Sequence, residues 1–203
     1  MKYLDFEKTM KPFTIFSVKD IKKRHPNFDN RRLVEWQQKG YITKIKRGFY
    51  YFSEQKINDH FLYFAANKIY APSYVSLQSA LAYYGFIPEG VFTTYSISTR
   101  NTTNYDTKVT AFKYKHIKSS LFFGYKLKQT DRYPIKIADA EKAILDFFYM
   151  NTLNTKIDIE AMRFNMLQIQ EKIDFNVLKQ YQRIFNSKTL DKRIALFKNL
   201  LNA

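Results

Sequence analysis

The residues best suited to chemistry in this chain are Asp106-Thr107-Lys108, a carboxylate-x-lysine triplet, with Glu89 upstream. Metal-dependent nucleases use carboxylates to hold a divalent ion and a lysine beside the attacking water. The same triplet pattern recurs at residues 20–22 and 54–56, as chance allows in a lysine-rich chain. We therefore interpret the triplet as fortuitous and expect that the protein is not an enzyme.

Residue types that bind metals or cofactors are sparse in this sequence. His25, His60 and His116 lie far apart and lack metal-ligand spacing, and the chain has no cysteine. Five glycines offer little material for a phosphate-binding loop. We expect no metal and no cofactor, and we interpret Glu141 and Asp146 as simple helix carboxylates.

The charge of the chain points instead to a polyanionic partner. The net charge is +16, with 14 Lys and Arg against 7 Asp and Glu in residues 1–60, and 20 against 11 in residues 61–203. Basic proteins attract nucleic acids and other polyanions. The N-terminal third has the denser positive charge, so a phosphate-binding face is expected there first.

The apolar content is suited to a packed core and not to a membrane span. Hydrophobic residues make up 45% of the chain, but no apolar run approaches the ~20 residues that a membrane helix needs. The apolar stretch 143–150 is interrupted by Asp146, and the N-terminus has no signal-peptide core. We expect a cytoplasmic protein with no membrane partner.

Two helices must position the N-terminal cations. Residues 17–23 start with the N-capping residue Ser17 and stop before Pro26. A second helix is expected to follow Asp29 as its N-cap and to end near residue 39, where Gly40 supplies a left-handed C-terminal cap. Two helices so closely spaced are typical of a helix-turn-helix.

The second helix, residues 30–39, is predicted to have two faces. At about 100° per residue, Leu33, Val34 and Trp36 fall on an apolar side that faces the core, with Trp36 as a core anchor. The residues on the opposite side are Arg31, Arg32, Glu35, Gln38 and Lys39. A mostly cationic outer face is the geometry of a recognition helix.

A basic hairpin is predicted to follow this helix. Residues 41–46 alternate like a strand, Arg47-Gly48 can make a tight turn, and residues 49–52 form the return strand. Two helices followed by such a hairpin have the order of a winged helix. Helix residues Asn30, Arg31 and Gln38 are assigned to base reading. Phosphate contacts are assigned to Arg32, Lys39, Lys44, Lys46 and Arg47.

The rest of the chain is predicted to be a mixed α/β body with C-terminal helices. Ser76 is expected to cap a helix closed by Gly85, and Asp139 to cap a helix over 140–150. The other predicted helices are 57–70, 159–172, 175–185 and 190–201. The predicted strands are 91–99, 108–114 and 122–128. The fold class is thus α+β, with a winged helix-turn-helix over 1–56 and a body over 57–203.

Several ordered segments resemble the AbiEi family of antitoxins. The central segment is 72–89, which reads PSYVSLQSALAYYGFIPE, and it is followed by the matching segments 98–100, 114–117, 121–125 and 137–146. The basic head with Arg47-Gly48-Phe49-Tyr50 fits the same pattern. The chain departs from the family at Ala140, where a proline often begins the helix, and the last fifty residues match less clearly.

The resemblance implies the antitoxin of a type IV toxin–antitoxin pair, used in abortive infection as a defence against phage. Members of this family bind operator DNA through the winged helix and repress their own operon. Their partner toxin resembles a nucleotidyltransferase, which the body domain counteracts. Two alternatives stay open: a winged-helix regulator without a toxin, and a protein or RNA interaction module. The sequence leaves the oligomeric state undetermined.

Overall fold

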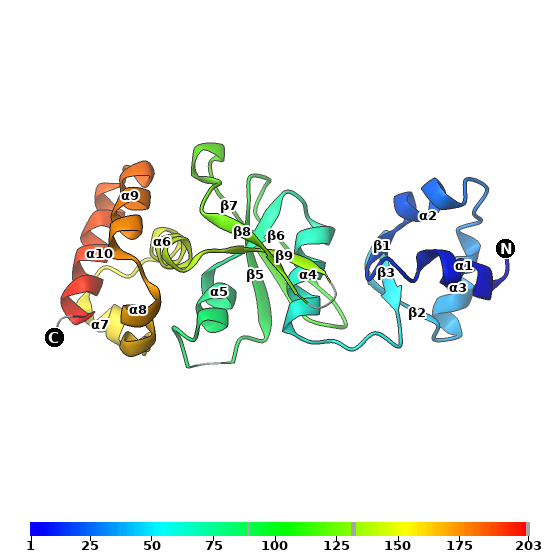
Figure 1. The fold of residues 1–203 in the computed structure, drawn as a ribbon, viewed down its shortest axis with the longest axis horizontal. Coiled ribbons are helices and arrows are strands. Elements are labelled where there is room, and N and C mark those ends of the chain that lie inside the picture. The colour runs from blue at the N-terminus through cyan, green and yellow to red at the C-terminus, as the bar shows by residue number, and fades with distance from the viewer. Residues whose placement is uncertain (89, 131–132, 202–203) are drawn as a thin grey trace.

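The structure, a computed structural model, describes residues 1–88, 90–130 and 133–201 and has a mixed α+β fold. The chain is elongated, with residues 1–52 at one end, a sheet-containing body in the middle and a group of helices at the other end (Figure 1). Within the described residues, no helix combines the length and the apolarity needed to cross a membrane.

The N-terminal unit, called the head here and defined as residues 1–52, contains three helices and a three-stranded antiparallel sheet of order β1-β3-β2. Its elements are α1 (Tyr3–Met10), β1 (Phe16–Ser17), α2 (Val18–Arg24), α3 (Arg31–Gln38), β2 (Ile42–Lys46) and β3 (Phe49–Phe52). The predicted helices and hairpin of this region are therefore present, and β1 and α1 were not predicted.

Local capping explains where the head's elements begin and end. The Ser17 side chain accepts from the Asp20 amide while the Asp20 carboxylate accepts from the Ser17 amide, which is a complete capping box for α2. Gly40 and Gly48 adopt positive φ values of 72° and 85°, which end α3 and turn the hairpin. The predicted cap of α3 needs correction, because the capping position is Asn30 and Asp29 accepts from the amide of Arg31.

The head has its own apolar core, in which Phe6, Phe28, Leu33 and Trp36 pack together. Trp36 is 2% exposed, which confirms its prediction as a core anchor. Val34 was predicted to face this core but is 56% exposed. The buried stripe of α3 is centred between Leu33 and Trp36, and Val34 lies about 100° away from Leu33 on the helical wheel.

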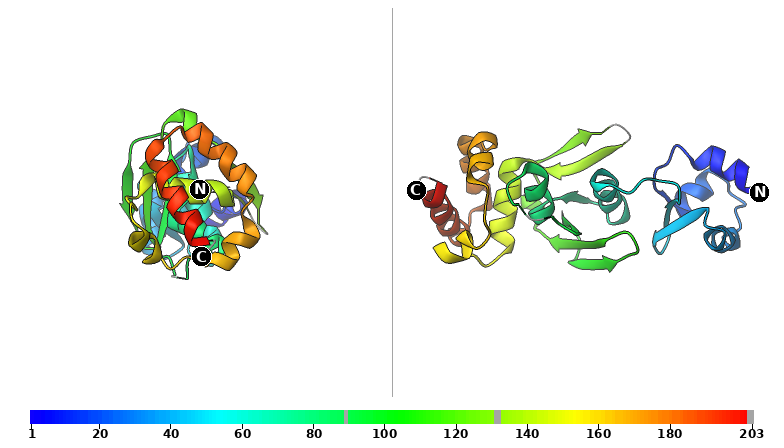
Figure 2. Two further views of the ribbon diagram at one scale, coloured as in Figure 1. Left: turned by 90° about the vertical axis from the view of Figure 1, so that its left-hand side faces the viewer. Right: turned by 90° about the horizontal axis from the view of Figure 1, so that it is seen from below.

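The head joins the body through residues 53–58, which form neither helix nor strand. Ile15, Ile45 and Tyr51 of the head belong to the body's core cluster, and the Tyr51 ring meets the Phe61 ring edge-on at 5.2 Å between centroids. The head is thus attached to the body by the short segment 53–58 and by this patch, and the right-hand view of Figure 2 shows it set apart.

A six-stranded mixed sheet of order β6-β7-β5-β4-β9-β8 forms the centre of the body. The strands are β4 (Ser73–Val75), β5 (Thr93–Ser98), β6 (Thr103–Asp106), β7 (Ala111–His116), β8 (Tyr125–Gln129) and β9 (Pro134–Ala138). The pairs β5–β7 and β4–β9 are parallel and the others are antiparallel. The prediction of three strands over 91–128 therefore missed β4, β6 and β9.

Helices cover both faces of this sheet. Helix α4 (Asp59–Ile69) lies on one face, where Tyr114 and Ser73 donate hydrogen bonds to the Ala66 carbonyl. Helix α6 (Ala140–Met150) lies on the other face and packs against α5 (Leu77–Tyr84). Asp139 caps α6 by accepting from the Lys142 amide, and Gly85 ends α5 at φ 74°, as predicted.

The C-terminal helices lie at the end of the molecule opposite the head, where the last two of them pack on α6 (Figure 1). They are α7 (Lys156–Glu160), α8 (Met166–Lys172), α9 (Phe175–Phe185) and α10 (Lys188–Leu201), and a short 3-10 turn, η1 (Ser119–Leu121), lies earlier in the chain. The single helix predicted over 159–172 is in fact α7 and α8. It breaks because Arg163 takes a positive φ of 50° and Asn165 caps a new helix.

Candidate nucleic-acid interface

The outer face of α3 carries the predicted base-reading residues. Asn30, Arg31 and Gln38 are exposed, and the Arg31 side chain is 90% exposed at the start of the helix. Leu33 and Trp36 hold the opposite side of the helix in the head core. The burial of that side fixes which residues α3 presents to solvent.

Carboxylates partly neutralise the cations of this face. Arg31 Nε lies 3.0 Å from Asp29 Oδ2, and Glu35 pairs with both Arg32 at 2.9 Å and Lys39 at 2.8 Å. Hydrogen bonds from Lys39 and Arg32 hold the pKa of Glu35 below its ordinary value. Because these pairs are exposed to water, each contributes little to stability. The cation of each pair can therefore release its carboxylate and bind another anion.

The hairpin adds a second group of cations beside α3. Lys44 on β2 and Arg47 in the turn are exposed. Lys46 is half-buried, with its Nζ 3.8 Å from the ring centroid of Tyr105 on β6 and 5.6 Å from that of Phe49. Of the predicted phosphate contacts, Lys44 and Arg47 are therefore open to solvent, whereas Lys46 is turned towards the body.

The nuclease-like triplet lies next to the head. Asp106, Thr107 and Lys108 line one side of a cleft of about 590 Å³, and residues of the head, among them Gln37 and Lys44, line the other. Glu89, the fourth member of that pattern, lies outside the described residues. Within the part of the chain that the structure describes, no cluster of three or more His, Asp or Glu side chains could hold a metal ion.

The three histidines remain apart in the fold. His25 Nε2 is 2.7 Å from the Thr9 hydroxyl in the head, and His116 Nδ1 is 3.1 Å from the Arg100 carbonyl in the body. His60 is exposed on α4. Arg100, a residue of the family-like segments, stacks on the Tyr70 ring at 4.2 Å, which is a structural contact within the body.

A buried charged network in the body was missed by the sequence analysis. Asp146 is fully buried and its carboxylate accepts from Tyr74 Oη at 2.9 Å, from Ser76 Oγ at 2.8 Å and from Lys142 Nζ. Lys142 Nζ also donates to Tyr74 Oη at 2.9 Å. Asp146 is therefore more than a helix-face carboxylate, and the Ser76 hydroxyl bonds to it and not to the first turn of α5.

This network connects three elements and has no opening to solvent. Burial lowers the pKa of Lys142 and raises the pKa of Asp146, in each case against the attraction of the partner charge. The side chains of both Lys142 and Asp146 are completely buried. The hydrogen bonds of this network connect Tyr74 of β4 and Ser76 at the start of α5 to Asp146 of α6, which fits a structural role. The signal in the sequence was the i, i+4 spacing of Lys142 and Asp146 within an otherwise apolar helix.

Comparison with known proteins provides no family for the chain, since neither the models of protein families nor the curated proteins give a match.

Proposed function

We propose that the protein is a sequence-specific DNA-binding regulator whose head is a winged helix, and that it acts as the antitoxin of a toxin–antitoxin pair. The observation that carries the DNA-binding part is the element order α1-β1-α2-α3-β2-β3, with the cationic face of α3 turned outwards beside a basic hairpin. In winged-helix proteins of this order the second helix of the helix-turn-helix enters the major groove.

In the proposed complex, α3 reads bases and the hairpin contacts the backbone. Arg31, at the exposed start of α3, and Gln38 can each make bidentate contacts to base edges. Lys44 and Arg47 would bind phosphates along the neighbouring strand. On binding, Arg32 and Lys39 would leave Glu35 and pair with phosphates. The free-energy cost of breaking the present pairs is small because they are exposed to water.

The test is fluorescence anisotropy of the protein on its own upstream DNA and on a scrambled duplex across a salt series. The Arg31→Ala, Arg32→Ala double variant should lose most of the preference for the native sequence. The Lys44→Ala, Arg47→Ala double variant should weaken binding to both duplexes and lower the salt slope by about 1.8, since each phosphate contact contributes ~0.9.

The matched control removes two positive charges far from the head. Lys188 and Lys192 are exposed on α10 and form no ion pair among the described residues. Their double alanine variant should bind the upstream DNA like the unaltered protein. Equal, weak binding of the unaltered protein to both duplexes would contradict the proposal and favour the interaction module.

The antitoxin part rests on the resemblance of ordered segments, which together cover about residues 12–150, to the AbiEi family. A neighbouring gene with a nucleotidyltransferase signature supports it, and an isolated gene favours a regulator without a toxin. Co-expression with that toxin provides the direct test. The full chain should restore growth, and the Arg31→Ala, Arg32→Ala variant should still restore it while losing repression of the operon. Failure of the full chain to restore growth would refute the antitoxin role.

A further inference from the structure

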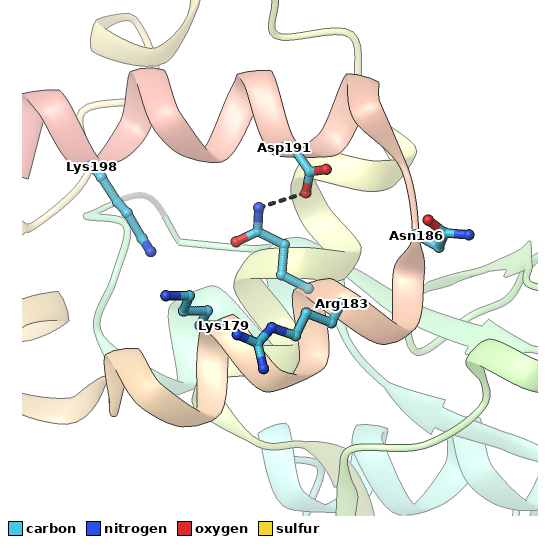
Figure 3. A pocket seen from close by; sticks show the side chains of 6 residues that line it. Lys179, Arg183, Asn186, Asp191 and Lys198 are labelled. Atoms are coloured by element: carbon cyan, nitrogen blue, oxygen red, sulfur yellow. Dashed lines mark hydrogen bonds between the residues drawn. The ribbon is translucent and has the colours of Figure 1, made fainter.

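A second basic surface lies at the end of the molecule opposite the head. The antiparallel helices α9 and α10 enclose an open groove of about 540 Å³. Its lining residues are Lys179, Gln182, Arg183, Asn186, Asp191 and Lys198. Figure 3 shows that the amines of Lys179 and Lys198 point into the space between the two helices, while the Arg183 guanidinium lies along α9 at the side of the groove.

Helical periodicity gathers these residues on one face. On α9, Phe175, Lys179, Gln182 and Arg183 follow the spacing i, i+4, i+7 and i+8, which aligns them along the helix. The Gln182 amide donates to Asp191 Oδ1 at 2.6 Å, and Lys198 Nζ lies 5.9 Å from the Phe175 ring centroid. Both contacts link α9 to α10 across the groove.

The groove's cations differ from those of α3 in their ion pairing. Among the described residues, the ion pairs do not include Lys179, Arg183 or Lys198. Asp191 is the acidic residue of the lining, and one of its oxygens is occupied by the Gln182 amide. An anion can therefore enter the groove without displacing an internal ion pair.

The aromatic ring of Phe175 lies next to the cations of the groove. A neighbouring cavity of about 450 Å³ is lined by Gln170, Phe175, Lys198 and Leu201, so it shares Lys198 with the groove. Phe175 is 37% exposed there. Cations that follow a backbone, next to an aromatic ring on which a base can stack, are the features of grooves that bind single-stranded nucleic acid.

We propose that the α9–α10 groove binds single-stranded nucleic acid, with Lys179, Arg183 and Lys198 on the phosphates and the Phe175 ring against a base. This site is separate from the proposed double-stranded DNA site of the head and does not depend on it. An acidic polypeptide could also satisfy the cations, but it would leave the exposed ring of Phe175 without a stacking partner.

The test is anisotropy of short fluorescein-labelled oligouridylate and oligothymidylate on the full chain carrying Lys44→Ala and Arg47→Ala, which suppresses binding by the head. Adding Lys179→Ala and Arg183→Ala should lower the affinity about tenfold or more and the salt slope by about 1.4. Phe175→Ala should lower the affinity at least about fivefold, from the loss of one stacked base. Phe175→Leu, which keeps the apolar volume but not the ring, should lose a similar amount if stacking is the cause.

The control adds Lys188→Ala and Lys192→Ala, which removes the same charge from α10 outside the groove, and it should change the affinity less than about twofold. Equal losses in the groove variant and in this control would overturn the proposal. So would polyglutamate competing as well as the oligonucleotides. Stronger binding of oligouridylate would identify RNA as the ligand, and stronger binding of oligothymidylate would identify DNA. Binding of operator duplex by the groove variant, with the head intact, should be unchanged.

Discussion

Replacing Asp146 with asparagine should destabilise the body severely, because it leaves the Lys142 ammonium buried without a counter-charge. In the structure both side chains are fully buried, and the other hydrogen-bond partner of Lys142 Nζ is the uncharged Tyr74 Oη. Removing one partner of a buried ion pair costs about 3–5 kcal/mol. That is a large part of the ~5–15 kcal/mol by which domains are stable.

A second change should reverse most of this loss. Lys142→Met in the Asp146→Asn background removes the unpaired charge and fills similar volume, while the asparagine oxygen can still accept from Tyr74 and Ser76. Replacing a whole buried pair by neutral groups is often neutral or stabilising. We expect the double variant to return to within about 2 kcal/mol of the unaltered protein, measured by guanidinium chloride unfolding followed by far-UV circular dichroism.

The pH dependence gives an independent check with a defined sign. Burial lowers the pKa of Lys142 in the folded protein below the ordinary value of 10.5. At pH values between the lowered pKa of the folded chain and the ordinary pKa of the unfolded chain, Lys142 is protonated in the unfolded chain and neutral in the folded one. The free energy of unfolding of Asp146→Asn should therefore rise with pH over that window. If Asp146→Asn costs less than about 1 kcal/mol, or if the double variant is no better, the interpretation as a buried charge pair is wrong.

Three further predictions concern local geometry. Ser17→Ala should cost about 1 kcal/mol in thermal unfolding, and this loss should shrink as pH falls through the pKa of Asp20, which lies below its ordinary value because hydrogen bonds from Ser17 and two nearby lysines together outweigh the effect of burial. Gly124→Ala should destabilise more than Gly48→Ala, because both have positive φ but an added Cβ at Gly124 would lie 3.0 Å from other side chains. Tyr105→Ala should speed trypsin cleavage in residues 53–58 by removing the ring beneath Lys46, and unchanged cleavage would show that this contact does not hold the head.

Elements with strong local signals could be predicted from the sequence. Capping residues and periodicity placed α2, α3, α5, α6 and α9 within a residue or two. The same is true of the β2–β3 hairpin, where alternation and Gly48 agree. These elements also carry the proposed DNA-binding residues, so their position on the outer face of the head followed from the pattern of buried and polar residues.

Elements that depend on distant partners could not be predicted. β4 is three residues long and fully buried between β5 and β9, so it lacks an alternating pattern. β6 reads Thr-Asn-Tyr-Asp and forms because β7 pairs with it. The turn of Lys46 towards Tyr105 and the pairing of Lys142 with Tyr74 are tertiary contacts that helix and strand periods do not encode.

The positive charge of the chain also affects the outer edge of the body sheet, where unpaired backbone groups of β8 could pair with another strand. β8 is an outer strand, and its exposed residues Lys126, Leu127 and Lys128 would meet any strand that added to that edge. The same edge of a second copy would bring its own lysines against these two, so repulsion between like charges opposes pairing of two chains at this edge. Salt at about 1 M screens charges beyond ~3 Å. The high-salt buffers that strip nucleic acid from a basic protein would therefore weaken this protection and favour self-association of the chain.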